Sequence, residues 1–147
     1  DASVTFVVMA FFTVAGVLWS TYGIQALFPA AMAGGLAAFF VYNHHPAKVF
    51  MGDTGSLFLG GLVAALGYCI KCPILLLLFG IVYVCETMSD IIQIGYFKIT
   101  HGKRIFKMAP IHHHFEMSGY TEKQIVVMFA VITAIGSALG ILALRFI

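Results

Sequence analysis

Long apolar runs, separated by short polar interruptions, dominate this chain. The runs extend over residues 4–22, 24–42, 55–70, 74–96 and 125–144. Four of them are close to the roughly 20 residues that an α-helix needs to cross the hydrocarbon core of a bilayer, and the shorter run 55–70 can just span if its helix starts near Thr54. The pattern therefore predicts an all-α integral membrane protein with five transmembrane helices.

The composition agrees with this prediction. Hydrophobic residues make up 61% of the 147 residues, and charged residues make up only 10%. A soluble domain carries about 25% charged residues, because a small domain has to cover itself with polar surface. The composition thus favours a membrane protein over a water-soluble domain.

Two polar segments, 43–54 and 98–123, interrupt the apolar pattern. Five helices joined by turns alternate in direction, which puts both segments on the same side of the membrane. That side would carry most of the basic residues, namely Lys48, Lys98, Lys103, Arg104, Lys107 and Lys123, against Lys71 and Arg145 opposite. Because Lys and Arg accumulate in cytoplasmic loops, we expect both segments to face the cytoplasm.

The sequence Gly52-Asp53-Thr54-Gly55-Ser56 stands at the start of the third apolar run. A carboxylate between glycines suits Mg²⁺, which prefers oxygen ligands and is commonly held by one or two carboxylates with substrate phosphates. Thr54 or Ser56 could instead cap the third helix, and its positive end would attract an anion. A plain helix cap at Asp53 explains the spacing as well as a metal site does.

Three consecutive histidines, His112, His113 and His114, lie in the second polar segment. A histidine can bind an anion when protonated, exchange protons, or ligate a metal. In an extended segment, His112 and His114 would share one face and His113 would oppose them. Contact with an anionic ligand is favoured over a zinc site.

Polar residues also mark one face of the fourth apolar run. Glu86, Asp90 and Gln93 fall at i, i+4 and i+7, which is one side of a helix. Ionisable groups inside a span are candidates for function, although a helix that leaves the membrane early would also wet this face. By contrast, Cys69 and Cys72 have no second ligand pair and indicate a helix end followed by a turn.

Both polar segments resemble motifs of one known family. Residues 43–56, with Asn43, Pro46-Ala47, and Val49 through Ser56, resemble the metal-site signature of the phospho-N-acetylmuramoyl-pentapeptide-transferases. Residues 110–116, followed by Gly119 and Glu122, resemble the histidine motif of the same family. Related polyprenyl-phosphate sugar-phosphate transferases share the first motif, but the unbroken histidine run favours the former family.

The resemblance implies an Mg²⁺-dependent enzyme of the bacterial inner membrane. Such an enzyme would transfer phospho-MurNAc-pentapeptide from UDP-MurNAc-pentapeptide to undecaprenyl phosphate, releasing UMP and lipid I for peptidoglycan synthesis. The family is typically a homodimer and a target of nucleoside inhibitors, and no nucleic acid is an expected partner. The roles that the resemblance implies are metal binding for Asp53, catalysis for Asp53, His112, His113 and His114, and substrate binding for Asn43, Phe50, Gln93, Ala109 and His113.

The family has about ten spans, so the resemblance implies that this chain is its C-terminal half and lacks the upstream catalytic aspartates. Two alternatives from other functional classes remain open. One is an ion or metal transporter that uses Asp53, Glu86, Asp90 and the histidines. The other is a non-catalytic membrane assembly partner.

Overall fold

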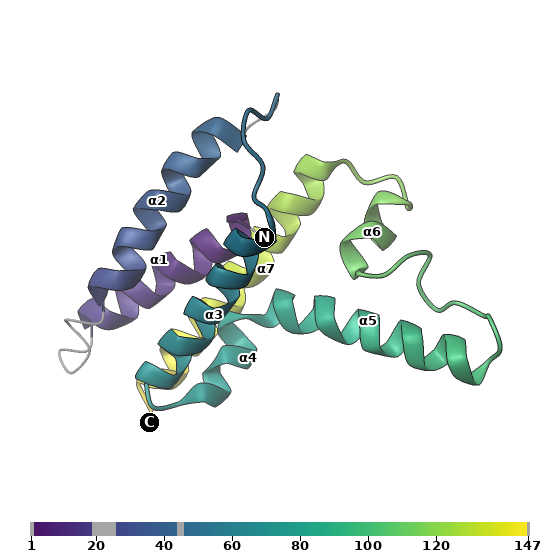
Figure 1. The fold of residues 1–147 in the computed structure, drawn as a ribbon. Coiled ribbons are helices and arrows are strands. Elements are labelled where there is room, and N and C mark those ends of the chain that lie inside the picture. The colour runs from purple at the N-terminus through teal and green to yellow at the C-terminus, as the bar shows by residue number, and fades with distance from the viewer. Residues whose placement is uncertain (1, 19–25, 44–45, 147) are drawn as a thin grey trace.

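The computed structural model describes residues 2–18, 26–43 and 46–146 (Figure 1). Within these ranges every regular element is helical, which confirms the all-α prediction. The predicted junction between the first two runs, at 22–24, lies outside the described residues. The elements are α1 (Ala2–Leu18), α2 (Leu27–Asn43), α3 (Asp53–Cys69), the 3₁₀ helix η2 (Pro73–Leu75), α4 (Leu76–Phe79), α5 (Ile81–Ile99), α6 (Ile111–Glu116) and α7 (Glu122–Leu144).

Helix α1 forms the centre of the packed core. It is apolar on all sides, and such a helix is stable only when it is covered on several sides. It packs against α2, α3 and α7. Val8 and Met9 are fully buried, and the ring of Phe12 stacks on Phe79 of α4 with 4.9 Å between ring centroids.

The predicted fourth helix, 74–96, is broken at Gly80. The helices before and after Gly80 are bent by 86°, and α5 runs away from the rest of the bundle (Figure 1). The break is packed against α7, where a Cβ built on Gly136 would lie 2.4 Å from the carbonyl oxygen of Leu78. A glycine is required at this point because the two backbones approach closely.

Helix α7 is the one unbroken helix in the described ranges that is long and apolar enough to cross a membrane. The bent pair Pro73–Phe79 and Ile81–Ile99 would make a second span if counted together. Helices α1, α2 and α3 are apolar but have 17 residues each. The fold is therefore compatible with a membrane protein, while the number of five spans stays a prediction.

The loop before α3 and the start of α7 lie toward the same end of the molecule, while α5 carries the start of segment 98–123 away to the side (Figure 1). Helix α2 ends, and α3 and α7 begin, toward the end that lies opposite the C-terminus (Figure 1). Helix α7 begins with a capping box, in which the Thr121 and Gln124 side chains each bond the other's backbone N–H. At the other end, Cys69 closes α3 and Lys71 follows with φ of 60°. The helix end at Cys69 and the turn that follows it confirm the prediction for this segment. The thiols of Cys69 and Cys72 are free.

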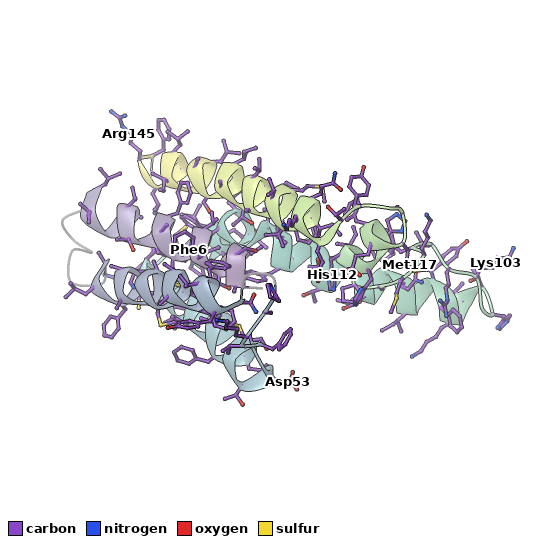
Figure 2. The ribbon with its side chains drawn as sticks, turned by 90° about the horizontal axis from the view of Figure 1, so that it is seen from above. Phe6, Asp53, Lys103, His112, Met117 and Arg145 are labelled. Atoms are coloured by element: carbon purple, nitrogen blue, oxygen red, sulfur yellow. The ribbon has the colours of Figure 1, made fainter. Side chains whose placement is uncertain are left out.

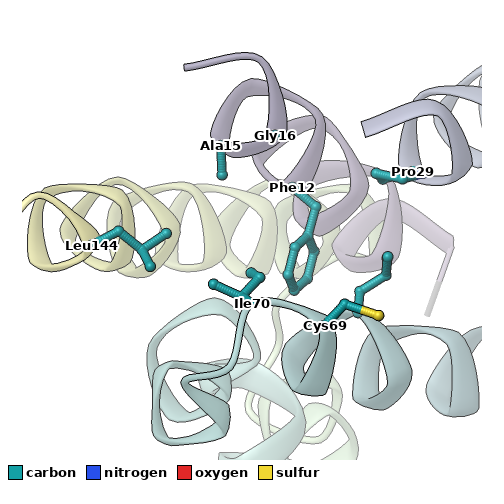
Figure 3. Close-up of a pocket in the computed structure, with 8 residues that line it drawn as sticks. Phe12, Ala15, Gly16, Pro29, Cys69, Ile70 and Leu144 are labelled. Atoms are coloured by element: carbon teal, nitrogen blue, oxygen red, sulfur yellow. The ribbon is translucent and has the colours of Figure 1, made fainter. Parts of the chain in front are cut away.

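A small cavity of about 20 Å³ lies where α1, α2, α3 and α7 meet (Figure 3). Its lining is apolar apart from the thiol of Cys69. A buried water needs two to four polar partners, which this lining does not offer. The cavity is therefore a feature of core packing rather than a ligand site.

Candidate active site

Asp53 is the first residue of α3 and its side chain is exposed. The N-cap of the helix is Gly52, which makes no side-chain cap hydrogen bond. Ser56 lies in the first turn, where its hydroxyl donates to the carbonyl oxygen of Asp53 at 3.0 Å. The prediction that Asp53, Thr54 or Ser56 is the N-cap of α3 is therefore wrong. The Asp53 carboxylate does not cap the start of this helix.

The loop before α3 is held by two hydrogen bonds. The Asn43 side-chain amide donates to the Val49 carbonyl at 2.8 Å, and the Lys48 N–H donates to the Tyr42 carbonyl at 2.8 Å. Phe50 follows directly and is 80% exposed. Asn43 therefore orders the loop that presents the Phe50 ring, while His44 and His45 lie outside the described residues.

The three histidines lie in the short helix α6 and not in an extended segment. Pro110 precedes the helix as its N-cap, after a cis peptide bond from Ala109. The expectation that His112 and His114 share a face is therefore wrong, because successive helical residues are about 100° apart. The rings of His112 and His113 lie 4.1 Å apart between centroids.

Each histidine uses its Nδ1 atom in a hydrogen bond. His112 pairs with Oε2 of Glu86, and His113 pairs with Oε2 of Glu116, both at 2.8 Å. Nδ1 of His114 accepts from the backbone N–H of Lys107 at 3.1 Å. Each of the three histidine rings is thus oriented by a hydrogen bond at Nδ1.

Gln93 holds the segment that leads into this helix. Its side-chain oxygen accepts from the N–H groups of Ile105 and Phe106 at 3.1 and 3.0 Å. Its side-chain nitrogen donates to the Phe106 carbonyl at 3.1 Å. The polar face predicted on residues 86–93 therefore binds the second polar segment through Glu86 and Gln93.

An open pocket of about 450 Å³ lies beside this face. Asp90 and Gln93 contribute to its wall from α5, and Ala109 lines it from the segment before α6. Lys98 and Arg104 add two positive charges. Two cations beside one carboxylate suit a ligand that carries negative charge.

The two predicted motifs come to one end of the molecule, but their side chains form separate groups. Figure 2 shows Asp53 and His112 on different elements, both distant from Arg145. Helix α6 packs against α5 and α7, whereas α3 packs against α1, η2 and α4. In the part of the chain that the structure describes, no three His, Cys, Asp or Glu side chains are grouped so that they could hold a metal ion.

These residues fit a share of an Mg²⁺ site. Asp53 offers one carboxylate that does not cap the helix. Mg²⁺ keeps several waters and is commonly held by one or two carboxylates plus substrate phosphates. The remaining ligands would have to come from substrate or from residues beyond this sequence.

Comparisons with known proteins place this arrangement in context. Residues 1–71 match the family described as glycosyl transferase family 4. The chain is 48% identical over 143 residues to the phospho-N-acetylmuramoyl-pentapeptide-transferase of Clostridium acetobutylicum, which covers 97% of this chain and 44% of that protein. The resemblance to the phospho-N-acetylmuramoyl-pentapeptide-transferase family is confirmed.

Two further relatives of the same name give similar values. The protein of Acetivibrio thermocellus is 49% identical over 144 residues, covering 98% of this chain and 43% of that protein. The protein of Carboxydothermus hydrogenoformans is 50% identical over 134 residues, and the match covers 91% of this chain and 41% of that protein. The chain thus spans less than half the length of these phospho-N-acetylmuramoyl-pentapeptide-transferases, and it corresponds to their C-terminal half.

Three partners of the histidines were not found from the sequence. Glu116 follows His113 by three residues, a spacing that brings side chains together only in a helix, whereas the sequence predicts a loop over 98–123. The N–H of Lys107 is a backbone group, which every residue except proline has, so its bond to His114 cannot be predicted from residue type. Glu86 lies 26 residues from His112, although a carboxylate in an apolar helix does signal that it needs a partner.

Proposed function

We propose that this chain is the C-terminal half of a phosphoglycosyl transferase that attaches a phosphosugar to a lipid carrier. The substrates would be UDP-MurNAc-pentapeptide and undecaprenyl phosphate, and the products lipid I and UMP. The observation that carries this proposal is the identity of about one half over nearly the whole chain to relatives named phospho-N-acetylmuramoyl-pentapeptide-transferase.

The geometry supports the proposal at the level of charge. The donor carries a diphosphate and the acceptor a phosphate, so the site has to accommodate several negative charges. Lys98 and Arg104 line the pocket beside α6, and the fixed histidines present polar atoms at the same end. Mg²⁺ held by Asp53 together with substrate phosphates would offset charge that develops during transfer.

We further propose that the protein lies in the bacterial inner membrane with five spans in this half and its site on the cytoplasmic face. The greater number of Lys and Arg residues in segments 43–54 and 98–123 supports that orientation. A homodimer and inhibition by nucleosides remain expectations from the family. The names of the relatives favour the transferase over a transporter built on Asp53, Glu86, Asp90 and the histidines.

The proposal is tested by Asp53→Asn in the longer protein that carries this sequence. Release of UMP from UDP-MurNAc-pentapeptide should fall on the order of 100-fold, the cost of removing one electrostatic stabiliser. Addition of a chelator should stop release by the wild type, and excess Mg²⁺ should restore it.

Arg145→Gln is the control. Arg145 is an exposed charged residue at the end of α7, far from Asp53 (Figure 2), so its substitution also removes one charge that interacts with a helix dipole, about 0.3–1 kcal/mol. Turnover within about twofold of wild type for both variants would contradict the role of Asp53. A well-folded wild type that binds nucleotide without releasing UMP would favour the assembly partner instead.

A further inference from the structure

The three histidines of α6 differ in the partner that each Nδ1 atom has. An ionised carboxylate can only accept a hydrogen bond, so Nδ1 of His112 and of His113 must carry a proton toward Glu86 and Glu116. A backbone N–H can only donate, so Nδ1 of His114 must be unprotonated. Within the part of the chain that the structure describes, the hydrogen bonds of these rings are made through Nδ1 and leave Nε2 available.

The partners therefore divide the histidines into two chemical kinds. In His112 and His113 the bond to a carboxylate puts a proton on Nδ1, so Nε2 of the neutral ring is an acceptor. In His114 Nδ1 is the acceptor, so the ring proton lies on Nε2. The edge of the His114 ring also contacts Phe106, with 5.7 Å between centroids.

The pair between Glu86 and His112 differs from the pair between Glu116 and His113 in its construction. Glu116 lies three residues from His113 on the same helix, and both side chains are more than a third exposed. Glu86 comes from α5, and its side chain is 20% exposed. Its second carboxylate oxygen, Oε1, is buried without a hydrogen-bond partner in the described structure.

A buried acceptor without a partner is unfavourable, and an exposed local ion pair such as that of Glu116 contributes little to stability. The position of the Glu86 carboxylate is therefore not explained by stability alone. Its hydrogen bond to Nδ1 supplies a fixed orientation of the His112 ring.

We propose that Glu86 is a positioning residue for His112, and that it holds the ring proton on Nδ1 so that Nε2 is left as an acceptor for a proton of the substrate. His114 is assigned the opposite tautomer, a neutral donor through Nε2. The part of this inference that concerns catalysis rests on the proposed function. The part that concerns the tautomers rests on the hydrogen bonds alone.

The tautomers are tested by nitrogen NMR on the longer protein labelled with ¹⁵N-histidine, because protonated and unprotonated ring nitrogens resonate far apart. Signals are assigned through His112→Gln and His114→Gln, each of which removes one ring. We expect a proton on Nδ1 of His112 and none on Nδ1 of His114. An unprotonated Nδ1 at His112 in the wild type would overturn the proposal.

Glu86→Gln tests the positioning role, since the amide keeps the shape of the side chain and can donate to Nδ1. Because the Gln amide can donate to Nδ1 as well as accept from it, the His112 proton should then be shared between Nδ1 and Nε2. The rate constant kcat for UMP release should fall by up to about 10⁴-fold, as it does for a wrong tautomer in a carboxylate–histidine pair. KM for the nucleotide substrate should stay within threefold.

Glu116→Gln is the matched control, because it removes a carboxylate at the same 2.8 Å distance from a neighbouring histidine. It should shift the signals of His113 and leave those of His112 in place, which shows that the change in the His112 signals is specific to Glu86. An unchanged His112 spectrum in Glu86→Gln, or a loss in that variant confined to KM, would overturn the positioning role. A folded wild type that releases no UMP would overturn the proposed function and the catalytic role of Glu86, while the NMR result would still decide the tautomers.

Discussion

The contact between Gly136 and the break before α5 gives a quantitative prediction for stability. An added Cβ at Gly136 would lie 2.4 Å from the Leu78 carbonyl oxygen and 3.2 Å from a methyl group of Ile81. The obstacle is backbone, so rotation of a side chain cannot relieve it. We expect Gly136→Ala to separate α7 from α4 or to distort the break.

The cost follows from two opposing effects. Overpacking a well-packed core costs about 1–3 kcal/mol, and a contact this close to backbone belongs at the upper end. Alanine is also better than glycine inside a helix by about 1 kcal/mol. The net loss for Gly136→Ala should thus be about 2 kcal/mol.

Gly61→Ala in α3 separates the two effects. A Cβ at Gly61 would meet nothing within 4 Å, so this variant receives the helical gain without the clash. At roughly 2–4 °C per kcal/mol, the melting temperature should fall by about 4–8 °C in Gly136→Ala and rise slightly in Gly61→Ala. The assay is thermal unfolding of the detergent-solubilised protein, and equal melting temperatures in the two variants would refute the steric argument.

Two further predictions concern the polar segments. Gln93→Leu removes three hydrogen bonds of about 1 kcal/mol each. Amide hydrogen exchange at Ile105 and Phe106 should therefore accelerate at least tenfold. Unchanged protection of both amides would show that Gln93 does not hold this segment. Phe50→Ala should weaken binding of UDP, measured by calorimetry, by about tenfold, the lower range of what stacking on a base contributes. The fold should tolerate this change because the ring is 80% exposed, and an unchanged Kd would count against stacking of the uracil on Phe50.

The sequence was sufficient for features that depend on local patterns. Apolar runs predicted the helices α1, α2, α3 and α7, and the spacing of Glu86 and Gln93 predicted a polar face on α5, which contacts the second polar segment. The break at Gly80 was missed because the residues around it are as apolar as a continuous helix would be. Hydropathy measures the solvent that a segment prefers, and a bend depends instead on what packs against it.

The candidate site was predictable in residue type and less so in geometry. The chemistry of Asp53 and the histidines could be inferred from their composition and motif. The sequence could not show which nitrogen of each ring makes a hydrogen bond. Glu86 and Lys107 come close to His112 and His114 only in the folded protein. The helical form of residues 111–116 was also missed, since three histidines and a preceding proline carry no apolar periodicity that would indicate a helix.

The bend at Gly80 makes α5 a lever with its pivot at the edge of the bundle. At 1.5 Å per residue, Ile99 lies about 28 Å from the pivot, whereas Glu86 lies only about 9 Å from it. A rotation of about 10° would thus move the far end of α5 by about 5 Å and the Glu86 position by less than about 2 Å. The contact that orients His112 sits close to the pivot, while Lys98 and Arg104 of the open pocket sit near the moving end. The bend therefore keeps the contact with the histidine near the fixed end of α5, while the two cations of the pocket lie near its far end.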